Sequence, residues 1–438
     1  MIEQARDNIT FAKRAGAVCL SAMPLLLGLA FAFILHWFIA PELGPFYSKV
    51  LIDVGIAIIL AVSLNIINGM TGQFSIGHAG FMAAGGYTAA AIMYYGSYHA
   101  FGEVGFFGGA VSWTRKPADF DGAFFAWGDL LFLGACLAGG SVAALLGLIV
   151  GLPSLRLRGD YLAIVTLGFG EIVRVLIEQS KPVIDADMID TVPAAQHILH
   201  LGGALGFSRQ PPFYYTTLFW VAAFVVLMLM VAYRLRQSTY GRAFLSIREN
   251  EIAAEAMGVP TTQYKVSAFV ISAFFAGVAG ALFAHQVGAG LNPSELGFMK
   301  SIDILIMVVL GGLGSISGAI VAATLLTILP EWLREPTHVW KLAIGAAVII
   351  VLARQQKATR PLLFLAGITG AIELARWLAI QYDVNLADYR MILYAGALVL
   401  MMILRPQGLF GIHEVWEFFR WPFKRRRPVA ADSKEAGR

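Results

Sequence analysis

The sequence predicts an all-α polytopic membrane protein of about eleven transmembrane helices. Of its 438 residues, 58% are hydrophobic and only 14% are charged, whereas about 25% of the residues of a soluble domain carry charge. The apolar residues form runs long enough to cross a bilayer, which takes about 20 residues of helix. The net charge of +4 is too small to indicate nucleic-acid binding.

The first apolar run begins close to the N-terminus. Arg6, Lys13 and Arg14 precede a hydrophobic stretch over residues 15–40. This stretch is longer than the roughly 7–15 apolar residues of a signal peptide and has no small-residue cleavage site, so a retained first span is expected. Cys19 and Cys136 both lie inside apolar runs, which predicts buried thiols rather than a disulfide framework.

The remaining spans follow in order along the chain. In full, spans are predicted at Val18–Phe38, Val50–Ile67, Phe74–Tyr95, Trp127–Val150, Tyr161–Ile177, Phe213–Tyr233, Val266–Val287, Val339–Ala353, Pro361–Ile380 and Met391–Leu404. The segment Ser301–Pro330 is too long for one straight span and too short for two, and GGLGS (311–315) interrupts it. A half-helix that enters the membrane and turns back, followed by a full helix, fits this length.

The positive-inside rule distinguishes two topologies for Ser301–Pro330. With the N-terminus in the cytoplasm and a segment that begins and ends outside, 21 Lys and Arg residues lie inside, 10 lie outside and Arg174 lies within a helix. If the segment crossed once, 14 would lie inside and 17 outside. The tail KRRR (424–427) and the loop RQQKATR (354–360) cause this difference. The charges therefore predict a re-entrant segment and two cytoplasmic termini.

A short charged stretch, GRAFLSIRENEIAAEAMGV over residues 241–259, interrupts the apolar runs on the cytoplasmic side. Asn250 or Glu251 can begin a helix, and Gly258 with Pro260 can end it. A helix that lies on lipid favours basic residues opposite large apolar ones, whereas this stretch has alanines and three glutamates. It is predicted to dock into a groove on another protein. The small or apolar face would consist of Ile252, Ala253, Ala256 and Met257.

Within this stretch, IAAEAMG resembles the EAA-x-x-x-G sequence of ABC-importer permeases, in which a cytoplasmic coupling helix sits in the ATPase subunit. Ala253, Ala254 and Gly258 match the pattern. Ile252 stands where the family has its first glutamate, and Glu251 lies one residue earlier. The resemblance implies a coupling helix near residues 248–258, with ATPase-coupling residues Arg248, Glu249, Glu251, Ala253, Ala254, Glu255 and Gly258.

Several longer stretches resemble one family more specifically. They are YGRAFLSIRENEIAAEAMGV (240–259), SLNIINGMTGQFSIGHAGFMAAGGYTAA (63–90), RLRGDYLAIVTLGFGEIVRVL (156–176), VLGGLGSISGAIVAA (309–323) and ILRPQGLFG (403–411). Together they resemble the "M" membrane permease of branched-chain amino-acid ABC importers. The resemblance covers most of residues 50–327 and the last helix.

This resemblance implies a bacterial inner-membrane protein with the ABC-importer permease fold. The expected partners are a homologous second permease, two cytoplasmic ATPases that bind ATP and magnesium, and a periplasmic substrate-binding protein. The chain itself is expected to carry no cofactor, no metal and no catalytic residue. Leucine, isoleucine and valine are the expected cargo, and urea or short amides, carried by similar permeases of the family, remain an alternative.

Two tracts depart from the family. Residues from about 335 to 386 look like an insertion that contains two apolar spans. The outer loop SKPVIDADMIDTVPAAQHILHLGG (180–203) replaces a glycine-rich T-x-G-x-x-G-I segment common in the family. The expected organisation is a permease core over 1–330, an inserted helix pair over 331–388, a final transmembrane helix over 389–411 and a basic cytoplasmic tail over 412–438.

Two segments share the spacing G-x-x-G-x-x-S, and their residues are Gly69, Gly72 and Ser75, and Gly311, Gly314 and Ser317. Glycine-interrupted segments at matching places in two halves predict a repeated fold with the transport path between the repeats. Glycine also permits close helix packing, so both explanations stay open. His78 follows the first break and belongs to the same candidate path, although a hydrogen-bonded structural role is favoured over a proton relay.

Glu171 and Arg174 lie three residues apart on one face of a predicted span. Charges at such depth are costly, and they pair with each other or line a path. A structural intramembrane ion pair is the favoured interpretation.

ATP is expected to bind elsewhere, because the chain has no Gly-Lys pair and therefore no G-x-x-x-x-G-K-[ST] phosphate loop. H-E-x-x-H and G-x-S-x-G catalytic sequences are absent as well. A stand-alone channel or secondary carrier is the competing hypothesis from another class. It would leave the helix near 248–258 without a partner.

The re-entrant topology is testable by cysteine labelling. Glu335→Cys and Asp388→Cys should react with an impermeant thiol reagent added from outside, because both positions are predicted to lie there. Gln356→Cys should be protected, because its loop is predicted to be cytoplasmic. Labelling of Gln356→Cys from outside would overturn the topology that the charges predict.

Overall fold

The computed structural model describes residues 23–112, 124–154, 160–208, 214–286 and 290–334, together with 395, 396 and 399. Within these residues the chain is helical and contains no strand, as predicted. Four described helices are long and apolar enough to cross a membrane, namely Met23–Met70, Trp127–Leu152, Leu218–Gln237 and Thr261–Ala284. The chain is therefore a polytopic helical membrane protein.

The helices of the core overlap the spans predicted for this part of the chain. They are α2 (Ala40–Asn65), which continues into the π-helical turn η2 (Ile66–Met70), α3 (His78–Phe101), α4 (Trp127–Ser154), α5 (Asp160–Glu178), α6 (Leu218–Gln237) and α9 (Thr261–Ala284). Two further helices, α7 (Thr239–Glu249) and α8 (Glu251–Ala256), lie between α6 and α9. The short turns η4 (Ala186–Thr191), η5 (Ala194–Leu199) and η6 (Gly203–Ser208) fold the segment between α5 and α6.

The long apolar helix Met23–Met70 contains a sharp change of direction. Gly44 adopts φ 74° and ψ 172°, outside the helical region, and Pro45 follows it. A proline removes a helical hydrogen bond and clashes with the preceding turn, so the chain bends here. Residues 23–34, the turn η1 (Leu35–Ile39) and the first residues of α2 therefore lie before the bend, and the buried part of α2 lies after it. This agrees with two predicted spans in place of one.

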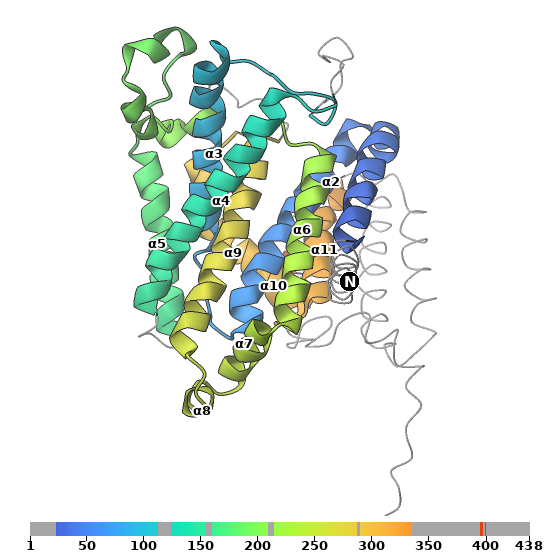
Figure 1. The fold of residues 1–438 in the computed structure, drawn as a ribbon, viewed down its shortest axis with the longest axis vertical. Helices are drawn as coiled ribbons and strands as arrows, with labels where there is room; N and C mark the ends of the chain where they lie inside the picture. The colour runs from blue at the N-terminus through green and yellow to red at the C-terminus, as the bar shows by residue number, and fades with distance from the viewer. Residues whose placement is uncertain are drawn as a thin grey trace, which may run out of the picture.

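Glycines allow α3, α4 and α9 to pack closely beside one another (Figure 1). A Cβ atom on Gly139 of α4 would lie 2.5 Å from the carbonyl oxygen of Gly85 of α3. A Cβ on Gly86 would lie 2.9 Å from the carbonyl oxygen of Gly280 of α9. Small residues at such contacts drive the association of helices in membranes, where water does not force apolar surfaces together.

The interrupted segment forms two helices, α10 (Phe298–Gly311) and α11 (Ile316–Arg334), which pack against each other. Gly312 and Gly314 between them have φ of 106° and 89°, which L-residues with side chains rarely adopt. The chain folds back so tightly that a Cβ on Gly311 would lie 2.5 Å from the carbonyl carbon of Gly318. The segment thus consists of a helix of 14 residues followed by one of 19.

Other predictions concern residues that the structure does not describe. The inserted helix pair from residue 335 onward, the basic tail and all of the final helix except residues 395, 396 and 399 lie outside the described residues. The total of about eleven helices and the re-entrant position of α10 and α11 in a membrane therefore stay predictions.

The contact between α3 and α4 generates a stability prediction. Gly139→Ala should destabilise the purified protein by about 1–3 kcal/mol, because the new methyl group overfills a backbone contact. Gly134→Ala on the same helix is the matched control, since a Cβ there meets nothing within 4 Å. The thermal unfolding midpoint in detergent measures both. Equal midpoints for the two variants would contradict the packing described.

Candidate functional site

The structure confirms the predicted start and end of α8. Asn250 has extended backbone angles, and its side-chain oxygen accepts a hydrogen bond of 3.0 Å from the N–H of Ala253. This contact is a helix N-cap, which satisfies a backbone donor that the helix itself cannot pair. Gly258, with φ 82°, follows the helix, and Pro260 stands before α9.

The coupling stretch expected near 248–258 contains the end of one helix and the whole of a second. Arg248 and Glu249 form the end of α7, and the extended Asn250 separates them from α8. Ser238 caps α7 by accepting a hydrogen bond of 3.3 Å from the N–H of Gly241. Asparagine favours such breaks because its side chain bonds to nearby backbone groups in place of the helical ladder.

The outer surface of α8 carries the residues predicted to dock. Ile252 is 66% exposed and Met257, directly after the helix, is 85% exposed. Ala253, Glu255 and Ala256 are exposed as well, whereas Ala254 is buried. In Figure 1, α8 projects from one end of the helical core, opposite the turns η4–η6. Two large apolar side chains are thus exposed at one end of the helical core.

Glu251 does not belong to this exposed surface. Its carboxylate forms an ion pair of 2.6 Å with Lys265 of α9, whose side chain is only 6% exposed. A buried ammonium group requires such a partner. Glu251 therefore fastens α8 to α9, which the sequence did not predict.

Arg248 also faces inward. Its Nη1 atom donates a hydrogen bond of 2.8 Å to the carbonyl oxygen of Gly69, in the turn η2 that ends the first long helix. Its side chain packs along Gly72, where a Cβ would lie 3.1 Å from Cγ of Arg248. The residue was predicted to couple this chain to a partner, and the structure places it against the first glycine break.

The two glycine breaks meet in space. Asn65 at the end of α2 accepts a hydrogen bond of 2.8 Å from the N–H of Gly314. Its amide nitrogen donates one of 3.0 Å to the carbonyl oxygen of Ser315. A Cβ on Gly69 would lie 2.8 Å from the Cα atom of Gly314. Segments almost 250 residues apart are thus held together by one fully buried side chain.

The geometry favours the packing explanation over the path explanation at most of these positions. Gly69, Ser75, Gly311, Gly314 and Ser317 are buried within this chain. Gly69 and Gly314 approach each other closely, and Gly311 contacts Gly318. Gly72 is the exception, because it is exposed and has φ 70°.

His78 takes part in a buried hydrogen-bond chain. Its Nε2 atom lies 2.8 Å from Oγ of Ser63, and the carbonyl oxygen of Ser63 accepts a bond of 2.6 Å from Oγ of Ser272. The contacts join α3, α2 and α9. They support the structural role favoured from the sequence.

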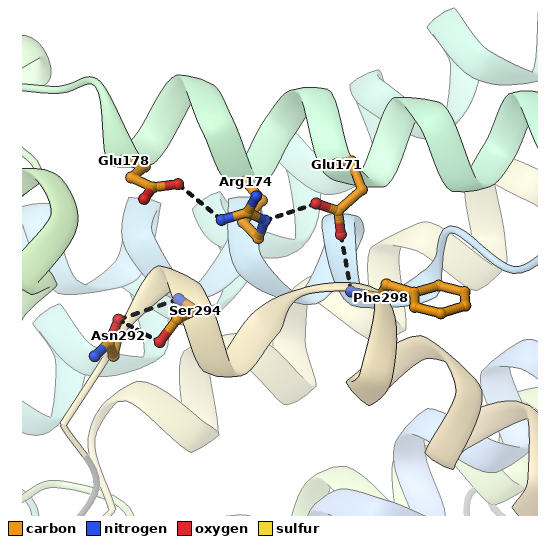
Figure 2. A network of polar contacts seen from close by, with 6 residues as sticks. All are labelled: Glu171, Arg174, Glu178, Asn292, Ser294 and Phe298. Atoms are coloured by element: carbon orange, nitrogen blue, oxygen red, sulfur yellow. Dashed lines mark hydrogen bonds and ion pairs between the residues drawn. The ribbon is translucent and has the colours of Figure 1, made fainter.

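The predicted pair of Glu171 and Arg174 is present, and it is part of a larger network that Figure 2 shows from close by. Nε of Arg174 lies 2.7 Å from Glu171, and Nη1 lies 2.7 Å from Glu178. Glu171 also accepts a hydrogen bond of 2.8 Å from the N–H of Phe298, the first residue of α10. A carboxylate at a helix N-terminus satisfies a free N–H and complements the helix dipole. The network therefore clamps α5 to the start of α10.

The chain is similar to branched-chain amino acid permeases over most of its length. A family described as "Branched-chain amino acid transport system / permease component" matches residues 46–353. The chain is 35% identical over 323 residues to the high-affinity branched-chain amino acid transport system permease protein LivM of Salmonella typhimurium, covering 70% of this chain and 68% of the relative. The LivM protein of Escherichia coli K12 matches with the same identity and coverage.

A more distant relative is the autoinducer 2 import system permease protein LsrC of Klebsiella pneumoniae. It is 29% identical over 171 residues, covering 35% of this chain and 49% of the relative. No solved structure matches the chain.

The network around Arg174 generates a second stability prediction. Arg174→Met should lower stability by about 1–3 kcal/mol, because it leaves two carboxylates without their cation in partly buried positions. Glu178→Gln should lower stability by about 1 kcal/mol or less. In that variant Arg174 remains paired with Glu171, and Glu171 still accepts the hydrogen bond from the N–H of Phe298. Thermal unfolding of the purified variants measures the difference. An Arg174→Met protein as stable as Glu178→Gln would show that Arg174 does not stabilise the two carboxylates.

Proposed function

This chain belongs to the branched-chain amino acid ABC transport permease family, and from that membership we propose that it is driven by separate ATPase subunits that dock on α8. As a permease of branched-chain amino acid transport, it moves its substrate without changing it chemically. ATP and magnesium would bind on the partner subunits. The lack of a phosphate loop in this sequence supports that division of labour.

The exposed surface of α8 is the observation that carries the proposal. Ile252 and Met257 are large apolar side chains at one end of the helical core, and Glu255 lies exposed between them. Apolar side chains on a helix face suit a groove on another protein. Contact with an anionic lipid surface would favour Lys or Arg on this helix, and α8 has neither.

The contacts that attach α8 to its neighbours would allow it to transmit movement of a docked partner. The ion pair between Glu251 and Lys265 holds it to α9, and the N-cap at Asn250 holds it to the end of α7. A docked ATPase would therefore push on the transmembrane helices and not on a loose loop. The rocking of the permease between outward-open and inward-open states would follow from that push.

The orientation in the membrane follows from the same surface. If α8 meets ATPases, it lies in the bacterial cytoplasm, and the turns η4–η6 lie on the periplasmic side of the inner membrane. Both termini would then lie in the cytoplasm, as the positive-inside rule predicts. Hydroxyl groups on α3 hold the segment that contains these turns in place. Tyr94 donates a hydrogen bond of 2.9 Å to the carbonyl oxygen of Ile184, and Tyr95 donates one of 2.9 Å to the carbonyl oxygen of His200. A periplasmic substrate-binding protein would approach this ordered surface.

The proposed assembly also contains a homologous second permease. The substrate path would run between the two permeases and beside the glycine breaks, because broken helices place backbone donors and acceptors near a path. Gly72 is the candidate path residue with an exposed position, whereas the buried glycines hold the breaks together.

The docking surface is testable at one residue. In the importer produced with its ATPase subunits, Met257→Asp should lower the ATPase that co-purifies with the permease by at least about tenfold, because a polar change at the centre of an interface costs about 2 kcal/mol or more. Met257→Leu is the matched control and should behave as the unmodified protein. Uptake of radiolabelled leucine into proteoliposomes should fall with the lost ATPase.

Normal ATPase recovery with Met257→Asp would show that α8 is not the docking surface. A Met257→Leu variant that lost the ATPase as completely would likewise contradict an apolar contact of this size.

A further inference from the structure

Three helix ends converge on the guanidinium group of Arg248. The first is the end of α2 and η2, where Gly69 accepts the hydrogen bond of 2.8 Å. The second is α7, because Arg248 lies in its last turn. The third is the turn between α10 and α11, where a Cβ on Gly314 would lie 2.5 Å from Nη1 of Arg248. We call Gly69, Gly314, Asn65 and Ser315 the glycine junction.

Elementary electrostatics explains why a cation lies at this place. The last carbonyl groups of a helix have no partner within the helix, and the helix dipole makes that end partly negative. Gly69 lies at such an end, and so does Arg248 in its own helix. The planar guanidinium carries several N–H donors in a fixed arrangement, so it can bond one carbonyl while lying flat against a second segment.

The guanidinium group fits against the junction because residue 314 is a glycine. A side chain at Gly314 would strike the guanidinium, and φ of 89° at that residue would strain any side-chain-bearing residue. Asn65 then ties the two breaks together through its bonds to Gly314 and Ser315. The result is a continuous set of contacts from the end of α7 to both breaks.

The segment formed by α7 and α8 therefore has two separate polar attachments to the transmembrane core. Glu251 joins it to α9 through Lys265, and Arg248 joins it to the glycine junction. The first attachment lies beside the exposed docking surface. The second lies where both helices are interrupted, next to Gly69 and Gly314.

We propose that Arg248 is a positioning residue that transmits movement of the docked α7–α8 segment to the glycine junction and so couples ATP hydrolysis to opening of the substrate path. The inference rests on the proposed docking of ATPases on α8. It assigns Arg248 to transmission within the chain and excludes it from direct contact with the ATPase. Coupling of this kind requires an element with two arrangements that both sites influence, and the junction would fill that role.

The test compares Arg248→Met with Arg242→Met in the complete importer reconstituted with its ATPases and binding protein. Arg242 is the matched control, because it is exposed on the same helix and its side chain bonds only to Thr239 among the contacts described. The quantities measured are ATPase co-purification, ATP hydrolysis, and radiolabelled leucine taken up per ATP hydrolysed. We expect Arg248→Met to keep its ATPase and to lose at least about tenfold in leucine per ATP, and Arg242→Met to keep both.

Each other outcome overturns the inference. An unchanged ratio of leucine to ATP in Arg248→Met would show that the contact transmits nothing. Loss of the ATPase from a variant that still unfolds at the normal temperature would show that Arg248 is part of the docking surface. Failure of Met257→Asp to release the ATPase would overturn the docking proposal, independently of this ratio.

If the importer with Arg248→Met does not assemble, the Arg248→Lys variant tests the inference in its place. A lysine keeps the charge, but its single nitrogen cannot both bond Gly69 and lie along Gly314. The ratio of leucine to ATP should then fall at least about threefold with normal assembly. A normal ratio in Arg248→Lys would contradict the inference.

Discussion

The contact between the two glycine breaks is the constraint on which the rest of this structure depends. Two helical segments end in the same region, and each leaves buried backbone groups that need hydrogen-bond partners within the protein. Asn65 accepts a hydrogen bond of 2.8 Å from the N–H of Gly314, and Arg248 donates one of 2.8 Å to the carbonyl oxygen of Gly69. Because both are polar side chains that reach across from other helices, the breaks are satisfied only when α2, α7 and the α10–α11 turn are all in place.

The same logic explains where charge is tolerated. Arg174 lies between two carboxylates, and one of these, Glu171, also bonds the first N–H of α10. Lys265 is nearly buried but pairs with Glu251. Two of these contacts join different elements, since Glu171 connects α5 to the start of α10 and Lys265 connects α9 to α8. Charged side chains that are partly or nearly buried thus have partners, and two of them fix a helix end to a neighbouring helix.

Local patterns in the sequence were sufficient for the apolar helices among the described residues, for the break at GGLGS and for the cap at Asn250, since each depends on neighbouring residues. They were also sufficient for the pair of Glu171 and Arg174, which lie on one helix face. The role of Asn65 could not be predicted, because its partners lie about 250 residues away. Arg248 and Glu251 were expected to face a partner, and only the path of α7 and α9 shows that both face inward.

A cryo-electron microscopy structure of the assembled importer in a lipid environment, with and without ATP, tests the central claim most directly. The account predicts that Ile252 and Met257 are buried against an ATPase in both states. It also predicts that Arg248 keeps its contact with Gly69 while the spacing between Gly69 and Gly314 changes with nucleotide. An α8 that touches lipid or solvent only, or a glycine junction that is identical in both states, would contradict the account.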